Sequence, residues 1–310
     1  SNIPVVHTLM GKGSINEDSN YYVGLIGTHG FDYANKAVDN ADVLILIGAR
    51  ATDRTTRGIK DFAKNADVIH IDIDPAEIGK NLETFIPVVG DIENVLSKLI
   101  KEITPIDTEN WINQIRTWKN SIEINKNPTD KINPRYALNN VSKKLDEESI
   151  LITDVGQNQI WCARNFKIMG NRKFLASGGL GTMGYSIPAA IGAKMGCPDK
   201  NVIAVAGDAG FQMSLFELGT VKEYDVNIVM IIFNNLGLGM VREIQDKKCE
   251  GEFGVNFKTN PDFVKLAESY GICAERVEKD DEFETVFEKA LNSDRAFLIE
   301  CVVDPHESTF

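Results

Sequence analysis

Short apolar runs alternate with longer amphipathic stretches along most of this chain. The first part contains four runs of strand length, at 4–8, 43–47, 68–73 and 87–89. Apolar residues recur at helical spacing over 31–40, 59–65 and 92–102. Such alternation is typical of βα units that feed a parallel sheet, so the first part predicts a small α/β domain.

The alternation stops and then resumes. A polar helix is expected over 111–124, and a stretch rich in Pro and Asn follows at 127–134. Beyond it we expect strands at 150–153, 202–206, 228–233 and 297–303, and helices at 135–144, 159–166, 187–195, 213–223, 261–270 and 282–291. The pattern predicts an α/β fold of two doubly wound parallel-sheet domains, at 1–125 and 126–310.

Net charge and cysteine content limit the partners and the compartment that we expect for this protein. The formal net charge of -12 would repel nucleic acid and anionic membrane surfaces, so neither is expected as a partner. The five cysteines form no CxxC pair, which is typical of reduced thiols in the cytosol. No apolar stretch approaches the roughly 20 residues of a membrane span. We therefore expect a cytoplasmic protein.

Two strand ends carry candidate ion ligands. "VIAVAGDAG" places Asp208 after one apolar run, and "NIVMIIFNN" ends the next run on Asn235. The carboxyl ends of parallel strands share one edge of the sheet, where ligands bind in such folds. Neighbouring strands lie about 4.7–4.9 Å apart, so the two side chains can reach one ion. A carboxylate, an amide oxygen and a backbone carbonyl form an oxygen set suited to Mg²⁺, with phosphate and water completing it.

Small residues surround Asp208. Gly207, Ala209 and Gly210 leave room for a phosphate to approach the amides at the start of the expected helix at 213–223. Asp-Gly and Asn-Asn-x-Gly are each common in ordinary turns. Their combination, with 24 residues between Ala209 and Asn234, is far more specific for a diphosphate held through Mg²⁺.

This pairing resembles the thiamine-diphosphate-binding signature, a Gly-Asp-Gly followed some two dozen residues later by Asn-Asn, with Ala209 as a small departure. The chain as a whole resembles the middle and C-terminal domains of acetohydroxyacid synthase (acetolactate synthase). "TDVGQNQIW" is similar to its first diphosphate loop, with Asn158 where histidine is usual. "SGGLGTMGYSIPAAIGA" is similar to its glycine-rich turn.

The resemblance implies specific roles. Asp208 and Asn235 would bind Mg²⁺ through their side chains and Gly237 through its carbonyl. Met183 would be the apolar wedge that bends thiamine into a V shape, although a core methionine under a glycine turn remains the alternative. The residues implied around thiamine diphosphate are Val155, Gly156, Gln157, Asn158, Gly181, Met183, Gly207, Asp208, Ala209, Gly210, Asn235, Gly237, Leu238 and Met240.

The first domain is similar to the flavin-binding middle domain of the same family, a Rossmann-like variant, through "PVVHTLMGKG", "GLIGTHGFDYANKAVDNADVLILIGARATDR" and "VIHIDIDPAEIGKN". Thiamine enzymes without flavin have similar folds, so two interpretations remain: a domain that binds FAD, and a domain of the same fold that does not. The residues implied around FAD are Gly27, Thr28, His29, Gly48, Ala49, Arg50, Asp72, Ile73, Asp91 and Ile92. Arg50 could bind a phosphate, and Asp72 and Asp91 could accept hydrogen bonds from hydroxyls or amides.

The family's reaction joins two 2-keto acids with loss of carbon dioxide, which involves no net redox change, so FAD would be structural. Ala51 replaces a usual phenylalanine in "ATDR", and Ile244 replaces a tryptophan linked to choosing 2-ketobutyrate as acceptor. A synthase for two pyruvates, biosynthetic or catabolic, is therefore open. The alternatives are a pyruvate oxidase or other thiamine-dependent decarboxylase, and a cofactor-binding module without catalysis.

The family's catalytic glutamate lies in an N-terminal pyrimidine-binding domain, which precedes the region that this chain resembles. We therefore expect a fragment with no catalytic residue of its own, weak cofactor binding and no turnover of pyruvate alone. The shared site implies a homodimer or tetramer, and a small regulatory subunit is a further partner that the resemblance suggests.

Overall fold

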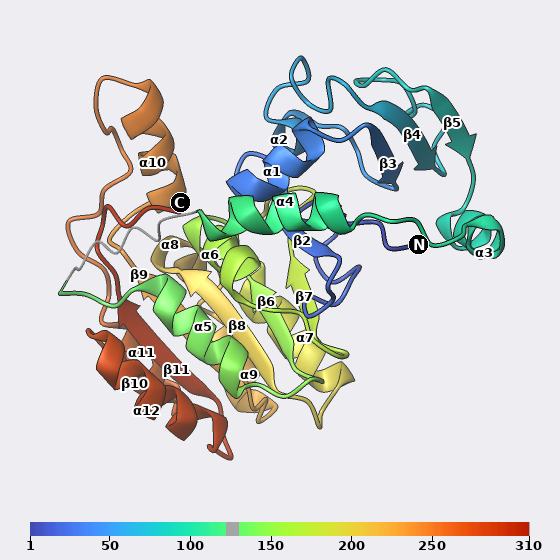
Figure 1. Cartoon of the computed structure of the whole chain (residues 1–310). Helices are drawn as coiled ribbons and strands as arrows, with labels where there is room; N and C mark the ends of the chain where they lie inside the picture. The colour runs from blue at the N-terminus through green and yellow to red at the C-terminus, as the bar shows by residue number, and fades with distance from the viewer. Residues whose placement is uncertain (122–129, 310) are drawn as a thin grey trace. The chain divides into compact units, whose positions relative to one another are not determined.

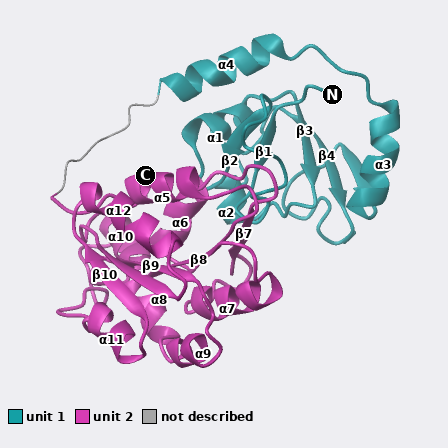
Figure 2. Cartoon of the chain, turned by 90° about the horizontal axis from the view of Figure 1, so that it is seen from below, with its two compact units in different colours: residues 1–125 teal, residues 126–310 magenta. Residues whose placement is uncertain are grey.

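The computed structural model describes residues 1–121 and 130–309. The chain divides into two compact units, residues 1–125 (unit 1) and 126–310 (unit 2), as Figure 2 shows. Both units combine helices with sheets whose strands pair in parallel. The predicted α/β class with parallel sheets is confirmed. The predicted helix end at 124 and the start of the loop at 127 lie outside the described residues.

Unit 1 carries two small sheets, one of two strands and one of three in the order β3-β4-β5 (Figure 1). Its apolar core gathers one face of α1 and α4 and the inner residues of β3 and β4. The strands are β1 (Val5–His7), β2 (Tyr22–Leu25), β3 (Val43–Ile47), β4 (Asp67–Asp72) and β5 (Ile86–Val89), and the helices are α1 (Asp32–Asp39), α2 (Asp53–Thr56), α3 (Ile92–Glu102) and α4 (Glu109–Asn120).

The helix predicted over 59–65 is wrong, because that segment forms turns. Arg57, Gly58 and Ala63 have positive φ angles of 60°, 126° and 50°, which an α-helix cannot contain. Phe62 and Ala63 are nevertheless buried in the unit 1 core. The spacing of apolar residues therefore indicated the burial of Phe62 and Ala63 correctly, but Ile59 is exposed and the backbone conformation differs from the predicted helix.

Unit 2 is built on one six-stranded parallel sheet in the order β10-β11-β9-β8-β6-β7. β8 and β9 lie inside this sheet and are buried along nearly their whole length. The strands are β6 (Ile150–Thr153), β7 (Lys173–Ala176), β8 (Val202–Gly207), β9 (Val229–Asn234), β10 (Cys273–Val277) and β11 (Phe297–Val302). The helices are α5 (Pro134–Lys144), α6 (Gln157–Asn165), α7 (Ser186–Gly196), α8 (Asp208–Met213), α9 (Glu217–Glu223), α10 (Gly239–Lys248), α11 (Phe263–Ser269) and α12 (Asp280–Leu291).

Helices cover both faces of the six-stranded sheet. Alternate residues of each central strand enter one of two apolar clusters, because successive side chains of a strand point to opposite faces. One cluster adds residues of α5, α6 and α12, and the other adds residues of α7, α8, α9 and α11. Among the described residues, no helix combines the length and the apolar character that crossing a membrane would require.

Three features of unit 2 differ from the sequence-based expectation. The helix expected over 213–223 begins earlier, as α8 at Asp208, and continues after a break as α9. α10 follows the Asn-Asn turn closely, in a segment where no helix was predicted. β7 and β10 were missed because edge strands are partly solvated and lack a long apolar run.

Candidate functional site

Three adjacent strands of unit 2 bring the polar residues of the site to one edge of the sheet. Asp154 follows β6, Asp208 follows β8, and Asn235 follows β9. The three strands are neighbours in the sheet and run parallel, so their carboxyl ends meet. Hydrogen bonds connect the segments that follow these strands to one another and to the glycine-rich turn before α7.

Asp208 is almost fully buried, with an exposed fraction of 1%. One carboxylate oxygen accepts from the backbone of Ala209 (2.9 Å). The other accepts from the backbone of Gly237 (3.1 Å) and from the amide of Asn260 (2.7 Å). Burial raises the pKa of Asp208, and these hydrogen bonds, together with the charge of Arg242, oppose that rise. A divalent cation at this carboxylate would offset the remaining cost of burying a charge.

Asn235 is also buried. Its contacts distinguish the oxygen corner (Oδ1) of its side-chain amide from the nitrogen corner (Nδ2). Its Nδ2 donates to Oε1 of Gln157 (2.8 Å), and its backbone carbonyl accepts from Arg242 (3.2 Å). Oδ1 is therefore the corner that is left for an ion. The preceding Asn234 has other partners: its Nδ2 donates to the buried carboxylate of Glu300 (2.8 Å), and its Oδ1 accepts from Asn260 (2.8 Å).

Gly237 lies in the turn between β9 and α10, where it pairs with Asn256 in an isolated antiparallel bridge. A Cβ on Gly237 would overlap the carbonyl oxygen of Val255. Only glycine lets the turn approach this closely, and its amide consequently reaches Asp208. The carboxylate, the amide and the glycine turn are thus brought together at the strand ends.

Asp154 is a residue of the site that the sequence analysis did not assign. It is fully buried, and its carboxylate accepts three backbone N–H groups, from Val155 (2.9 Å), Gly184 (3.0 Å) and Ser186 (3.0 Å). It therefore joins the loop after β6 to the glycine-rich turn before α7. The signal for it is present in the sequence, because "ITDVG" ends a strand on an aspartate as "AGDAG" does.

Gly210 has a second reason for being small. A Cβ at Gly210 would lie 2.6 Å from Oδ1 of Asp154, so the first turn of α8 can pass this carboxylate only with glycine there. Gly207 differs, because a Cβ on it would meet Asn158 at an ordinary 3.6 Å. The tight packing around Asp208 thus comes from Gly210, while Gly207 is dispensable on steric grounds alone.

The loop after β6 supplies the residues expected around the diphosphate. Gly156 adopts φ 134° and begins α6, whose first residues Gln157 and Asn158 are buried. Asn158 donates to the hydroxyl of Thr153 (3.2 Å), and Gln157 donates to Glu243 (3.0 Å) and to the carbonyl of Glu307 (2.8 Å). Both side chains are thus held by the protein itself.

The remaining predicted residues of unit 2 border the same edge with different exposure. Met183 is half-buried in the turn that Asp154 holds through Gly184, whereas Gly181, with φ 66°, is exposed. Leu238 and Met240, at the start of α10, are half-buried, and the amide of Leu238 donates to Val255 (2.8 Å). Ala209 is buried beside Asp208.

In unit 1 the residues expected around FAD also follow strands. Gly48 follows β3, Asp72 ends β4, and Asp91 comes shortly after β5, at one edge of the three-stranded sheet. Gly48 packs against Ile92, because a Cβ there would overlap that side chain. Gly27 and Thr28 follow β2, in the other sheet, and the amide of Thr28 donates to the carbonyl of Arg54 (2.8 Å).

The polar groups of that edge have local partners. The carboxylate of Asp72 accepts from the amide of Asp74 (2.9 Å), and that of Asp91 caps α3 through Asn94 (3.1 Å). Several of the residues expected around FAD are exposed or half-exposed, namely Thr28, His29, Gly48, Ala49, Arg50, Ile73, Asp91 and Ile92. This edge therefore offers an open surface, in contrast to the buried edge of unit 2.

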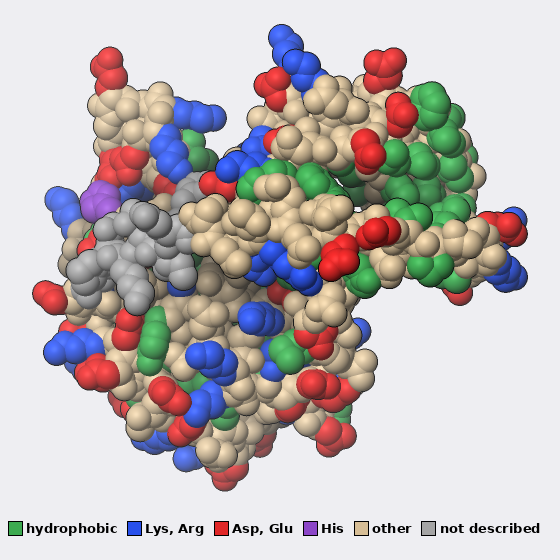
Figure 3. All heavy atoms as spheres, in the orientation of Figure 1, with side chains coloured by type: hydrophobic (Ala, Val, Ile, Leu, Met, Phe, Trp, Pro, Cys, Tyr) green, Lys and Arg blue, Asp and Glu red, His purple; other side chains and the backbone are tan. Residues whose placement is uncertain are grey.

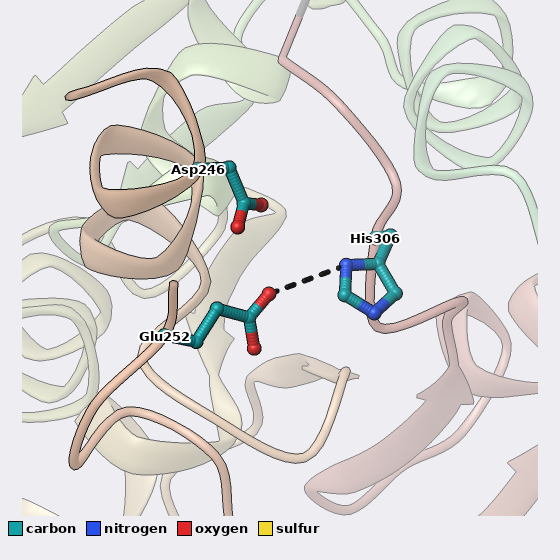
Figure 4. A group of neighbouring side chains, drawn as sticks. All are labelled: Asp246, Glu252 and His306. Atoms are coloured by element: carbon teal, nitrogen blue, oxygen red, sulfur yellow. Dashed lines mark ion pairs between the residues drawn. The ribbon is translucent and has the colours of Figure 1, made fainter. Parts of the chain in front are cut away.

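A second group of potential ligands lies on the surface of unit 2. Atoms of Asp246, Glu252 and His306 approach within 4.8 Å of one another, and Nδ1 of His306 lies 3.5 Å from Oε1 of Glu252 (Figure 4). Asp246 and His306 are exposed. The group connects the C-terminal segment (residues 303–309) to α10 and to the loop that follows it.

Comparison with known proteins gives two family matches. Residues 1–99 match the central domain of thiamine pyrophosphate enzymes, and residues 154–301 match their C-terminal thiamine pyrophosphate-binding domain. The chain is 46% identical to the probable acetolactate synthase large subunit of Methanocaldococcus jannaschii and 44% identical to that of Methanococcus aeolicus. It is 35% identical to the acetolactate synthase isozyme 2 large subunit of Escherichia coli.

These alignments cover 99%, 98% and 99% of the chain, but 54%, 54% and 56% of the respective relatives. The chain therefore spans about half the length of the curated relatives that it matches. The matched region contains both units and every residue of the candidate site.

Proposed function

The chain belongs to the thiamine pyrophosphate enzymes, and from this premise we propose that it forms the central and diphosphate-binding part of an acetolactate synthase. The names of its relatives support this reaction. The observation that carries the proposal is the edge of unit 2, where a buried aspartate and a buried amide end two adjacent strands.

We assign a Mg²⁺ site to Asp208, Asn235 and the carbonyl of Gly237. The donor set consists of hard oxygens, which suits Mg²⁺ and leaves positions for phosphate oxygens and water. The buried carboxylate has no basic side chain in hydrogen-bonding contact among its described partners, which are Ala209, Gly237 and Asn260. Arg242 acts on this carboxylate only through its charge, and a divalent cation would supply opposite charge in direct contact.

The diphosphate would lie against the loop at 155–158 and the first turn of α8, at Ala209 and Gly210. When bound, thiamine diphosphate would supply a nucleophilic carbon for the keto group of a 2-keto acid and would hold the electron pair left when the acid loses its carboxylate as carbon dioxide. The residues of this chain would orient the cofactor: Asp154 holds the turn with Met183 in place, and Met183 would support the bent thiamine.

We further propose that unit 1 binds FAD at the strand ends of β3, β4 and β5. The support is the close passage of the backbone at Gly48 and the exposed guanidinium of Arg50, which could pair with a phosphate. Titration of FAD into the chain, followed by quenching of flavin fluorescence, tests this. We expect Arg50→Ala to weaken binding, and an absence of quenching by the parent chain would reject the assignment.

The proposed substrates are 2-keto acids, with pyruvate as the main candidate. The proposed assembly is a homodimer or tetramer, and a small regulatory subunit is a further proposed partner. The five free cysteines suit a reducing cytosol. The proposal on assembly can be checked by light scattering with and without thiamine diphosphate.

Calorimetry tests the central proposal. Thiamine diphosphate is titrated into the chain with excess Mg²⁺ or with EDTA, and into Asp208→Ala under the same conditions. We expect heat of binding only for the parent chain with Mg²⁺, and a loss of affinity of about 100-fold or more for the variant. Equal affinity with EDTA, or in Asp208→Ala, would show that the ion site is assigned wrongly.

A further inference from the structure

One face of α10 reaches Asn235 or its partner Gln157 at three positions: Gly239 and Arg242 lie against Asn235, and Glu243 accepts from Gln157. Gly239, Arg242 and Glu243 are spaced i, i+3 and i+4, so they lie on the same side of the helix. A Cβ on Gly239 would overlap Oε1 of Gln157 and Nδ2 of Asn235, so glycine there leaves room for the hydrogen bond between these amides. Arg242 holds the backbone carbonyl of Asn235.

The orientation of the Gln157 amide follows from its acceptors. Its nitrogen lies 3.0 Å from a carboxylate oxygen of Glu243 and 2.8 Å from the backbone carbonyl oxygen of Glu307. A backbone carbonyl oxygen is always an acceptor, and an ionised carboxylate has no proton to donate. The NH2 group of Gln157 must therefore face both partners. Its oxygen is then directed at Asn235, from which it accepts at 2.8 Å.

Glu243 is held in turn by the C-terminal segment. It accepts from the hydroxyl of Ser308 (3.2 Å), from the backbone and hydroxyl of Thr309, and from Lys247 (3.1 Å). Arg135 of α5 pairs with Glu307, and Trp161 donates to the carbonyl of Ser308 (2.9 Å). The C-terminal segment thus fixes both acceptors of the Gln157 amide.

We propose that Gln157 is a positioning residue, held by Glu243 and the Glu307 carbonyl, that turns the oxygen corner of Asn235 toward the metal. An asparagine amide has one oxygen and one nitrogen corner, and only the oxygen can bind Mg²⁺. Because Gln157 accepts from the nitrogen corner, the oxygen corner is the one presented. This inference rests on the proposed magnesium site and adds a requirement for amide orientation.

The test measures Mn²⁺ binding by electron paramagnetic resonance, in the presence of thiamine diphosphate, and needs no activity. Gln157→Leu keeps a similar side-chain volume and removes the acceptor for Asn235. We expect it to weaken Mn²⁺ binding about tenfold, as is common for residues that orient metal ligands. Glu243→Ala should weaken binding less, because the Glu307 carbonyl remains.

The decisive comparison uses Asn235→Asp. A carboxylate presents an oxygen at both corners, so its orientation no longer matters. In the Asn235→Asp background, Gln157→Leu should change Mn²⁺ affinity less than about threefold. Equal losses in both backgrounds would mean that Gln157 acts through packing alone, and the proposal would be overturned. Failure of Asn235→Asp to bind Mn²⁺ would overturn it as well.

Controls separate this inference from the proposed function. Glu223→Gln, on the exposed side of α9, controls for the loss of one carboxylate. Retention of Mn²⁺ by Asp208→Asn, or no binding by the parent, overturns the magnesium site and the amide orientation with it. Loss in Asp208→Asn but none in Gln157→Leu overturns only the orientation.

Discussion

Units 1 and 2 both place polar residues after parallel strands, yet they treat those residues differently. In unit 2, Asp154 and Asp208 are buried and accept hydrogen bonds from several segments of the chain. In unit 1, Asp91 is exposed and caps only the helix that follows it. Asp72, which ends β4, is buried as well, but its carboxylate accepts from the nearby backbone N–H of Asp74. The strand ends of unit 2 differ because distant segments of the chain also donate to their buried carboxylates.

The surfaces differ in the same direction. Unit 1 exposes the apolar side chains of Ile73, Phe85, Ile86 and Val89, and α3 buries none of its residues fully. Figure 3 shows hydrophobic side chains gathered over the part of unit 1 that carries β4 and β5. Unit 2 also exposes large apolar side chains, such as Leu180 and Phe253, but most of these lie outside its strands. The three-stranded sheet exposes Val43, Ile47, Ile86 and Val89 from its strands, because a small sheet is covered less completely than a large one.

The largest expected difference concerns two phenylalanines. Phe211 of α8 is fully buried and packs edge-on against Phe263 with ring centroids 5.4 Å apart, whereas Phe85 of unit 1 is 68% exposed. We expect Phe211→Ala to lower the free energy of unfolding by about 3–5 kcal/mol. Phe85→Ala should change it by less than about 0.5 kcal/mol.

Chemical denaturation measures both changes. Trp161 is buried in unit 2, and Trp111 and Trp118 form an edge-on pair on α4 of unit 1, so tryptophan fluorescence can report on each unit separately. One variant that keeps only Trp161, and another that lacks only Trp161, assign the fluorescence change of each transition to unit 2 or to unit 1. Similar losses for both phenylalanine variants would contradict the comparison.

The next difference concerns two aspartates that follow strands. Asp154→Ala leaves three backbone N–H groups without their acceptor inside unit 2, and we expect a loss of about 3 kcal/mol. Asp91→Ala removes one exposed helix cap and should cost about 1 kcal/mol. The same denaturation experiment measures them, and a larger loss for Asp91→Ala would reverse the ranking.

Glycine replacements sharpen the comparison within unit 2. Gly210→Ala would put a Cβ 2.6 Å from Asp154, so we expect a loss of about 1–3 kcal/mol. Gly192 lies in α7 with nothing within 4 Å of its Cβ position. Gly192→Ala should therefore stabilise the chain by up to about 1 kcal/mol through helix propensity. Thermal unfolding of both variants checks the opposite signs.

The smallest effect is the dependence of unit 1 on pH. Burial lowers the pKa of His7, although the Thr8 carbonyl raises it, and burial lowers the pKa of His70 against the charges of Asp72 and Glu77. Between the lowered pKa and the ordinary value near 6.5, the unfolded chain binds more protons than the folded chain. The stability of unit 1 should therefore fall as the pH drops below about 6.5.

Denaturation of unit 1 at a series of pH values, followed by Trp111 and Trp118, tests this prediction. His70→Gln should flatten the dependence, because it removes one of the two buried groups that titrate in this range. An unchanged pH dependence in His70→Gln would show that His70 makes no contribution.

The sequence alone determined the class of fold and which polar residues end the two central buried strands. The uninterrupted apolar runs at β8 and β9 predicted buried parallel strands, and the residues that end them, Asp208 and Asn235, followed from that prediction. Strong local signals of this kind need no tertiary information, because a strand buried on both faces must be apolar along its length.

Tertiary structure alone decided how these residues are oriented. The hydrogen bonds from Gln157 to Asn235 and to Glu243 join positions 78 and 86 residues apart, and the sequence carries no signal for such pairs. The same holds for the turns at 59–65, where apolar spacing suggested a helix but the positive φ of Ala63 prevents one. Amide orientation and backbone handedness depend on which distant groups come into contact, and that is fixed only when the chain packs.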